Sequence, residues 1–199
     1  MTTVHLTEVG PRDGLQNEKG LIPTEAKIAF VDALTDAGHR QIEVSSFVRP
    51  DRVPAMADAE AVFNGIRRAP GVRYMGLVAN QRGLDRAQAV NCDTIAVFTA
   101  ASSSFTRANV SMTVEESLSR YRPLVAQAGS ARGYVSTIFE CPFEGPTEPH
   151  KVIAVAEQLL EMGCYEVSLG DTTGVGKPGQ VRRLLDEVVP ALGTDKVAL

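Results

Sequence analysis

Short runs of apolar residues alternating with polar ones recur along the chain, and each is followed by a stretch whose apolar positions have helical spacing. This pattern predicts strands at residues 4–9, 39–46, 72–79, 93–99, 133–140 and 165–169, with a further strand beginning at 196–199. A strand followed by a helix recurs every roughly 20 to 40 residues, as in parallel sheets with helical crossovers. The pattern therefore predicts an α/β fold.

The predicted helices have residues suited to their ends. Thr24 is expected to cap the first helix and Gly38 to end it. Thr113 and Glu116 have the spacing of a capping box, in which each satisfies the other's backbone amide. Pro123 lies inside the helix that follows and is expected to bend or shorten it. Residues 100–111, rich in Ser, Thr and Asn, are expected to form a binding loop.

Two architectures fit this periodicity, a barrel and an open doubly wound sheet. The first strand is followed by Gly10-Pro11-Arg12-Asp13, not by the glycine fingerprint of open dinucleotide-binding folds. This difference favours the TIM (β/α)8 barrel. A complete barrel needs about 250 residues, so the chain is expected to form a single domain over residues 1–199, an incomplete barrel of about six βα units plus the start of strand seven.

Polar residues follow several predicted strands, at the end that forms the catalytic face of a barrel. A carboxylate is a hard oxygen ligand for a divalent ion, and a guanidinium is a planar donor for a developing oxyanion. An ordinary turn with paired charges is the alternative interpretation of an Arg-Asp dipeptide. The residues at these strand ends are Arg12, Asp13, Glu43, Ser46, residues 137–141, Ser168 and Asp171.

Composition narrows the classes of partner. The chain is 44% hydrophobic and 22% charged, with a net charge of -4, which gives no basic footprint for nucleic acid. Its sequence has neither an apolar run near the roughly 18 residues of a membrane span nor a signal peptide, so no membrane partner and a cytoplasmic location are expected. Cys92, Cys141 and Cys164 are widely spaced, which predicts reduced thiols rather than disulfides or a zinc site.

Four strings of residues resemble one enzyme family. They are EVGPRDGLQNE at 8–18, EVSSFV at 43–48, CPFEG at 141–145 and GCYEVSLGDTTG at 163–174. In this order they resemble 3-hydroxy-3-methylglutaryl-CoA (HMG-CoA) lyase, one of the metal-dependent barrel lyases. The resemblance implies cleavage of HMG-CoA to acetoacetate and acetyl-CoA, as in leucine degradation and ketone-body metabolism. It also implies a divalent metal, Mg²⁺ or Mn²⁺, and an acyl-CoA substrate.

The resemblance also assigns roles to residues of these strings. Asp13 matches the family's metal-binding aspartate and Arg12 its catalytic arginine, which also contacts the substrate. Glu43 matches an acidic residue of the same site, where it is expected to orient Arg12 or the waters of the metal. The other positions that match the lining of the family's site are Gln16, Ser46, Cys141, Ser168 and Asp171. Structural hydrogen bonding is the alternative for these residues, and Cys141 is expected at the rim of the site.

The chain also departs from the family pattern. The family's two metal-binding histidines belong to an HxH string that would follow Leu199, as would its catalytic cysteine and a last asparagine ligand. The 199 residues alone are therefore expected to be weakly active or inactive. A homo-oligomer, dimer or tetramer, is expected. The alternatives are a related Claisen-type acyltransferase making isopropylmalate or homocitrate, an aldolase of the same barrel group, and a non-catalytic fragment that pairs with another chain.

Overall fold

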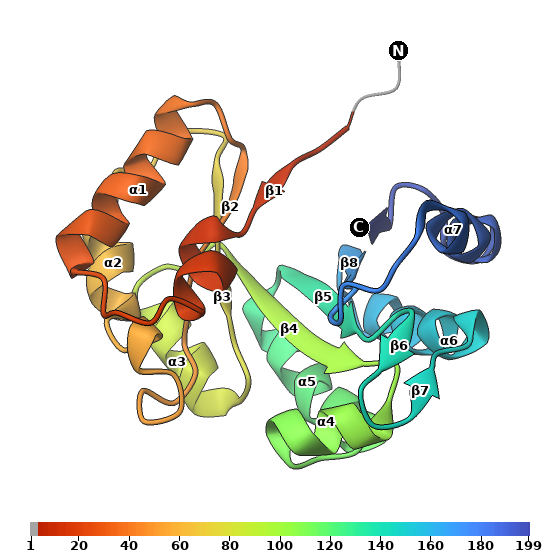
Figure 1. Ribbon diagram of the computed structural model, residues 1–199. Helices are drawn as coiled ribbons and strands as arrows, with labels where there is room; N and C mark the ends of the chain where they lie inside the picture. The colour runs from red at the N-terminus through yellow and green to blue at the C-terminus, as the bar shows by residue number, and fades with distance from the viewer. Residues whose placement is uncertain (1–3) are drawn as a thin grey trace. The chain divides into compact units, whose positions relative to one another are not determined.

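The structure is a computed structural model that describes residues 4–199. The chain divides into two compact units, Met1–Ala96 and Val97–Leu199, with the boundary inside strand β4 (Thr94–Ala100). Each unit has parallel strands and helices alternating along the chain (Figure 1). The expectation of a single domain over residues 1–199 stays a prediction.

The first unit contains a parallel arrangement in the order β1-β2-β3-β4. Its helices α1, α2 and α3 lie on one side of the strands β2 and β3 (Figure 1). Five of the six residues of β2 are buried, as expected for a strand covered on both faces. The elements besides β4 are β1 (Thr7–Glu8), the π-helical turn η1 (Gly10–Gly14), α1 (Thr24–Asp36), β2 (Gln41–Ser46), the 3₁₀ turn η2 (Pro54–Met56), α2 (Ala59–Gly65), β3 (Arg73–Leu77) and α3 (Gln81–Ala89).

The second unit contains the parallel strands β5, β8 and β9, in that order, and a separate antiparallel hairpin formed by β6 and β7. Helix α6 packs on β5 and β8 and against α7. Its apolar stripe of Val152, Val155, Ala156 and Leu159 is buried, as is typical of an amphipathic helix. The elements are α4 (Ser103–Val110), α5 (Val114–Ala128), β5 (Ala131–Ser136), β6 (Glu140–Cys141), β7 (Gly145–Pro146), α6 (Pro149–Glu161), β8 (Glu166–Leu169), α7 (Pro178–Leu192) and β9 (Val197–Ala198).

Several helix ends are as predicted. The capping box of α5 is complete, since the Glu116 amide donates to the Thr113 hydroxyl at 3.1 Å and the Thr113 amide donates to the Glu116 carboxylate at 2.7 Å. Gly38, just beyond α1, has a φ of +95°, which a side chain would disfavour. None of the helices among residues 4–199 is long and apolar enough to cross a membrane.

Two predicted segments differ in the structure. The first strand is only Thr7–Glu8, because β1 pairs with β2 over two residues, and Val4 and Leu6 before it are exposed. Residues 100–111 are not a loop, since most of them form α4. The Ser102 hydroxyl accepts a hydrogen bond from the Phe105 amide and caps this helix, so part of the polar composition serves the helix end.

The prediction for Thr24 was wrong, and of the two effects predicted for Pro123, bending or shortening, the shortening was wrong. Thr24 is the first helical residue rather than the cap, which is Pro23, and its hydroxyl donates to Asp58 at 2.7 Å. Pro123 does not shorten α5, which continues to Ala128. Proline removes one backbone hydrogen bond, and the buried face of α5, which includes Tyr121 and Leu124, offsets that loss by packing.

Candidate active site

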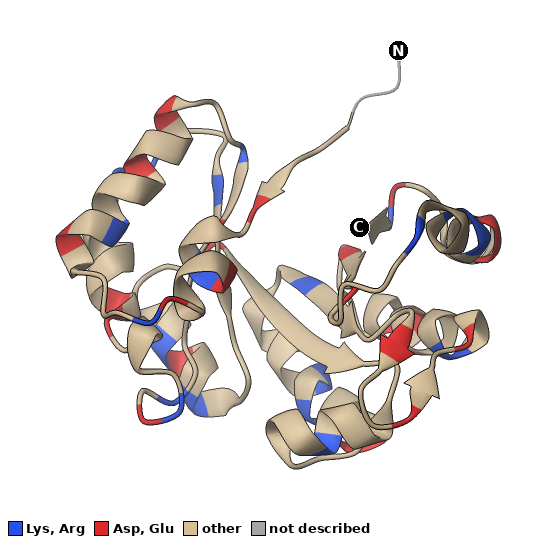
Figure 2. Cartoon of the chain, viewed as in Figure 1, with Lys and Arg blue, Asp and Glu red and all other residues tan. Residues whose placement is uncertain are grey.

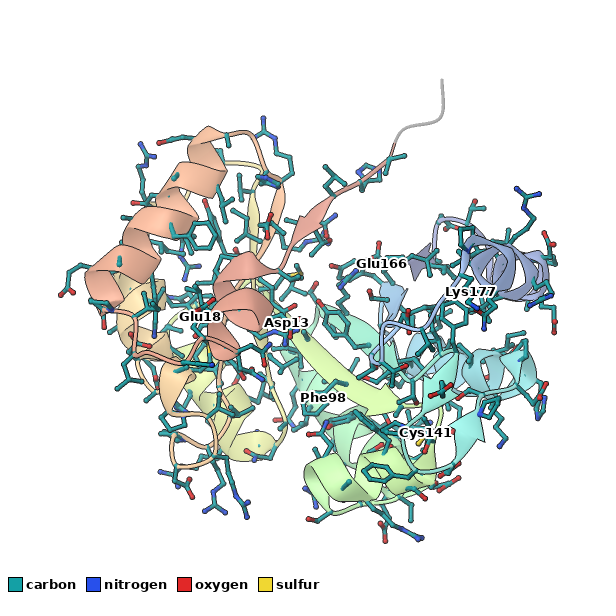
Figure 3. The ribbon with its side chains drawn as sticks, in the orientation of Figure 1. Asp13, Glu18, Phe98, Cys141, Glu166 and Lys177 are labelled. Atoms are coloured by element: carbon teal, nitrogen blue, oxygen red, sulfur yellow. The ribbon has the colours of Figure 1, made fainter. Side chains whose placement is uncertain are left out.

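Arg12 and Asp13 lie on η1, directly after β1. The Glu8 carboxylate accepts a hydrogen bond from the Gly10 amide at 2.6 Å, and the chain then turns. This turn buries Pro11 and Arg12 but leaves Asp13 exposed. Charges of both signs therefore meet on one turn at the carboxyl end of β1 (Figure 2), and Figure 3 shows Asp13 there.

A buried carboxylate fixes the Arg12 guanidinium. Its Nε donates to Glu43 Oε1 at 2.6 Å and its Nη1 donates to Asp13 Oδ1 at 2.7 Å. The Glu43 side chain is 0% exposed and that of Asp13 is 56% exposed. Burying Glu43 without a cation would be costly, so the pair stabilises both the carboxylate and one orientation of the guanidinium. The predicted contact between Glu43 and Arg12 is present.

A bulge in β2 accompanies this arrangement. The pairing of β2 with β3 shifts register between Glu43 and Ser45, which leaves Val44 as an extra residue. Such bulges change the direction of side chains near the end of a strand. Ser46 follows the bulge, is completely buried, and has a hydroxyl with no hydrogen-bond partner among the described residues. A buried unpaired hydroxyl is unusual in a folded protein.

Gln16 lies beyond η1 and is half-buried. It lines a shallow pocket of about 340 Å³ between the segments 16–21 and 52–55. The positively charged side chains of Lys19 and Arg52 also line this pocket.

In the second unit, Cys141 lies on the β6–β7 hairpin (Figure 3) and is buried. Its Sγ is 2.9 Å from the Ser102 hydroxyl, which donates to Glu144 at 2.8 Å. Because a hydroxyl has one hydrogen, the Cys141 thiol is the donor in the first contact. The Phe143 amide donates to the sulfur at 3.4 Å. Cys141 is therefore held at the start of α4 rather than presented to solvent.

Asp171 lies just beyond β8, and loop amides bind both of its carboxylate oxygens. The Gly176 amide donates to Oδ2 at 2.8 Å and the Val175 amide donates to Oδ1 at 3.3 Å. Ser168 is half-buried on β8, opposite Tyr134 of β5. Structural hydrogen bonding is therefore one role of Asp171, and its role toward a substrate stays a prediction.

The two other cysteines, half-buried Cys92 and buried Cys164, have a packing role. Burial raises the pKa of Cys92 to about 12 and that of Cys164 to about 12. Thiols with these pKa values are poor nucleophiles near neutral pH.

Sequence reasoning missed Lys27, and it missed the structural roles of Thr137 and Glu144, which lie within segments that it did single out. Lys27 is buried in α1, where its Nζ donates to the Ala55 carbonyl and to Asp58 at 2.6 Å each. Lys27 lies four residues before buried Val31, so the helical spacing places it on the buried face of α1, and this spacing could have revealed it. The φ of +60° at Thr137 and the contact of Glu144, on the β6–β7 hairpin, with the start of α4 gave no such signal, because both depend on the path of the loops.

The described residues supply an incomplete set of donors for a metal. Among residues 4–199, His, Cys, Asp and Glu side chains do not gather in any group of three that would hold an ion. Asp13 supplies one exposed oxygen donor of the hard type that Mg²⁺ and Mn²⁺ prefer. One carboxylate alone does not make a divalent-ion site.

Comparison with known proteins shows the family. A family model described as HMGL-like matches residues 3–199. The chain belongs to the HMG-CoA lyase family. It is 46% identical over 200 residues to the 3-hydroxy-3-methylglutaryl-CoA lyase, cytoplasmic, of Rattus norvegicus, covering 98% of this chain and 58% of the rat protein. The chain thus spans little more than half the length of that lyase.

Solved structures of HMG-CoA lyases share the fold. The lyase from Pseudomonas aeruginosa has a TM-score of 0.94 at 45% identity, covering 98% of this chain and 66% of that one. An HMG-CoA lyase from Acinetobacter baumannii, solved with coenzyme A and 3-methylmalate, has a TM-score of 0.93 at 35% identity, covering 99% of this chain and 67% of that one. These matches confirm the predicted fold class, an incomplete α/β barrel.

Proposed function

We propose that this chain provides the Arg-Asp part of an HMG-CoA lyase site, which cleaves HMG-CoA to acetoacetate and acetyl-CoA. The observation that carries the proposal is the Arg12 guanidinium, pinned by completely buried Glu43 beside exposed Asp13. A charge pair that only stabilised the fold would not need a second, solvent-facing carboxylate on the same guanidinium. The membership of the lyase family supports the same assignment.

Arg12 is assigned to the thioester end of the substrate. In the cleavage the tertiary hydroxyl loses its proton, the adjacent carbon–carbon bond breaks, and the electron pair of that bond becomes a thioester enolate. A fixed guanidinium needs no reorganisation when this negative charge develops. By comparison with other oxyanion donors, such a group contributes about 3 kcal/mol to transition-state stabilisation. Glu43 acts through Arg12, whose orientation it holds.

Asp13 is assigned as one oxygen ligand of a divalent ion, Mg²⁺ or Mn²⁺. When bound, such an ion would acidify the tertiary hydroxyl and bind the carboxylate of the substrate. Among the described residues, Asp13 is the one ligand assigned to the ion. The 199 residues alone are therefore expected to bind the ion weakly and to cleave HMG-CoA slowly or not at all.

The remaining predicted residues are assigned to the substrate. Ser46, with its buried unpaired hydroxyl, is proposed to bind the acyl group or a water that contacts it. Gln16, Ser168, Asp171 and Cys141 stay proposed lining residues, with Cys141 at the rim. The bound coenzyme A of the Acinetobacter baumannii lyase supports an acyl-CoA substrate.

The test uses the chain alone and a chimera in which these 199 residues replace the matching part of the Pseudomonas aeruginosa lyase. With Mg²⁺ and HMG-CoA, the chain is expected to form acetoacetate near background, and the chimera to form it readily. The substitution Arg12→Gln in the chimera should lower kcat by about 100-fold. A folded chimera without lyase activity would contradict the proposal, as would full activity in the Arg12→Gln chimera.

Two further expectations belong to the same proposal. A homo-oligomer, dimer or tetramer, is proposed for the protein, to be checked by sedimentation. A cytoplasmic location is also proposed, although similar lyases carry both cytoplasmic and mitochondrial names.

A further inference from the structure

Thr137 has an unusual backbone conformation at the end of β5. Its φ is +60°, and the residue is completely buried. β-Branched side chains rarely adopt this left-handed region, because the side chain crowds the backbone. Strained residues of this kind persist only where neighbouring contacts hold them, and they often occur at functional sites.

The main chain on both sides of Thr137 is held by residues that directly follow β4 and β8. Just before it, the Ser136 carbonyl accepts a hydrogen bond from the Ala101 amide at 3.0 Å. Just after it, the Ile138 amide donates to the Gly170 carbonyl at 3.3 Å. Thr137 therefore occupies the corner at which the chain changes partners from the end of β4 to the end of β8.

The amide of Thr137 contacts the loop after β8. It donates to the Thr172 hydroxyl at 2.9 Å. Thr172 directly follows Asp171, whose carboxylate binds the amides of Val175 and Gly176. The bond from the Thr137 amide to the Thr172 hydroxyl thus adds to the main-chain bonds at Gly170 and ties the left-handed corner to the Asp171 loop beyond the end of β8.

Close packing restricts the loop on its other side. A Cβ added to Gly176 would lie 2.6 Å from the Phe139 ring and 2.8 Å from Asp171 Oδ2. Such distances require movement, so the loop backbone approaches both groups as closely as glycine permits. The loop has little room to adjust if its attachment to Thr137 is lost.

We propose that Thr137 is a positioning residue for Asp171, which it holds in place through the bond from its backbone amide to Thr172. The proposal builds on the proposed function, in which Asp171 lines the substrate site. The strain at Thr137 is then retained because the corner that it forms aligns the ends of β5 and β8. The side chain of Thr137 is not the part that acts.

The test measures amide hydrogen exchange in the 199-residue chain, so it does not depend on lyase activity. Thr172→Val removes the acceptor and keeps the shape of the side chain. It is expected to accelerate exchange at Thr137, Val175 and Gly176 by at least about tenfold. Thr172→Ser restores the hydroxyl and should restore slow exchange. Unchanged rates at Val175 and Gly176 in Thr172→Val would overturn the proposal.

The adjacent Thr173 provides a matched control. Its hydroxyl is buried and has no hydrogen-bond partner among the described residues, so Thr173→Val should leave the three exchange rates unchanged. The Val167 amide, bonded to the Lys196 carbonyl at 2.8 Å, reports on opening of the sheet as a whole. Equal acceleration at Val167 and at Val175 would show general destabilisation and would contradict local positioning.

Thr137→Gly distinguishes the contribution of the Thr137 backbone amide from that of its side chain. Glycine adopts positive φ without strain and keeps the amide, so the exchange rates at Val175 and Gly176 should stay within about twofold of the original chain. A tenfold increase in Thr137→Gly would show that side-chain packing holds the loop and would overturn the proposed route through the amide. Failure of the lyase assay with these results intact would count against the proposed function alone.

Discussion

Glu43 in the first unit and Asp171 in the second unit are carboxylates held in different ways. In the first unit, Glu43 is completely buried and is held by the guanidinium of Arg12. In the second unit, Asp171 is held by loop amides, and Glu144 by the Ser104 amide and the Ser102 hydroxyl. The amide of Ser104 and the Ser102 hydroxyl also lower the pKa of Glu144.

This difference separates two ways of preorganising a site. A buried ion pair is strong only while both partners remain, because removing one leaves an uncompensated charge. Main-chain donors belong to the fold, so changing one side chain removes fewer interactions. We therefore expect substitution of Glu43 to cost more stability than substitution of Asp171.

The largest expected effect follows from Glu43→Gln. The change keeps the shape of the side chain but removes its charge, so Arg12 loses its buried counter-ion. The free energy of unfolding is expected to fall by about 3 kcal/mol, measured by urea denaturation at neutral pH. The change should also lower the lyase activity of the chimera, because Arg12 is no longer held in one orientation.

Asp13→Asn is the matched control for this experiment. It removes the other carboxylate on Arg12, which is more than half exposed. Exposed ion pairs contribute little, so the loss of stability should stay below about 1 kcal/mol. Equal losses in the two variants would show that burial of Glu43 does not set the strength of the pair.

The same contrast explains what the sequence allowed us to predict. Arg12, Asp13 and Glu43 were identifiable because they lie at the ends of predicted strands within strings that resemble the family, and the contacts among them are present. The bulge at Val44 and the left-handed Thr137 were not identifiable. Both depend on the register of strands far apart in the sequence, which local patterns do not encode.

Helix predictions divided in a similar way. The capping box at Thr113 and Glu116 was predictable, because both partners lie within one turn. The prediction of a loop over residues 100–111 was wrong, since Ser and Thr residues suit both loops and helix starts. Helix α4 also depends on Glu144, whose carboxylate accepts a hydrogen bond from the Ser104 amide. Glu144 lies 40 residues after Ser104 in the sequence. Such a distant contact leaves no signal in the local sequence.

Asp171→Asn is expected to lower the free energy of unfolding by less than Glu43→Gln does. The asparagine keeps one oxygen that accepts a loop amide, but its amino group faces the other amide. The expected loss is about 1 kcal/mol in the free energy of unfolding, together with faster hydrogen exchange at Val175 and Gly176. A loss as large as that of Glu43→Gln would remove the contrast between the two units. Thr173→Val in the same loop is the control for a neutral change.

The smallest expected effect concerns Asp58 in the first unit. It is a change in how the free energy of unfolding falls at acidic pH. Partial burial alone would raise the pKa of Asp58, but hydrogen bonds from Lys27 and Thr24 outweigh it and lower the pKa. A carboxyl whose pKa is lower in the folded state adds stability above its unfolded pKa of about 3.9, and this stability is lost as pH falls through the lowered value.

Lys27→Met tests this linkage, because it removes the cation that binds Asp58. Between about pH 6 and pH 3, the fall in unfolding free energy should become smaller by a few tenths of a kcal/mol, since Asp58 is partly exposed and solvent screens the pair. The measurement compares urea midpoints at both pH values, with Asp58→Asn as the control that removes the titrating group itself. The same pH dependence in Lys27→Met as in the original chain would show that Thr24 and the backbone, not the buried lysine, keep Asp58 ionised. The first unit would then hold this carboxylate much as the second unit holds Glu144.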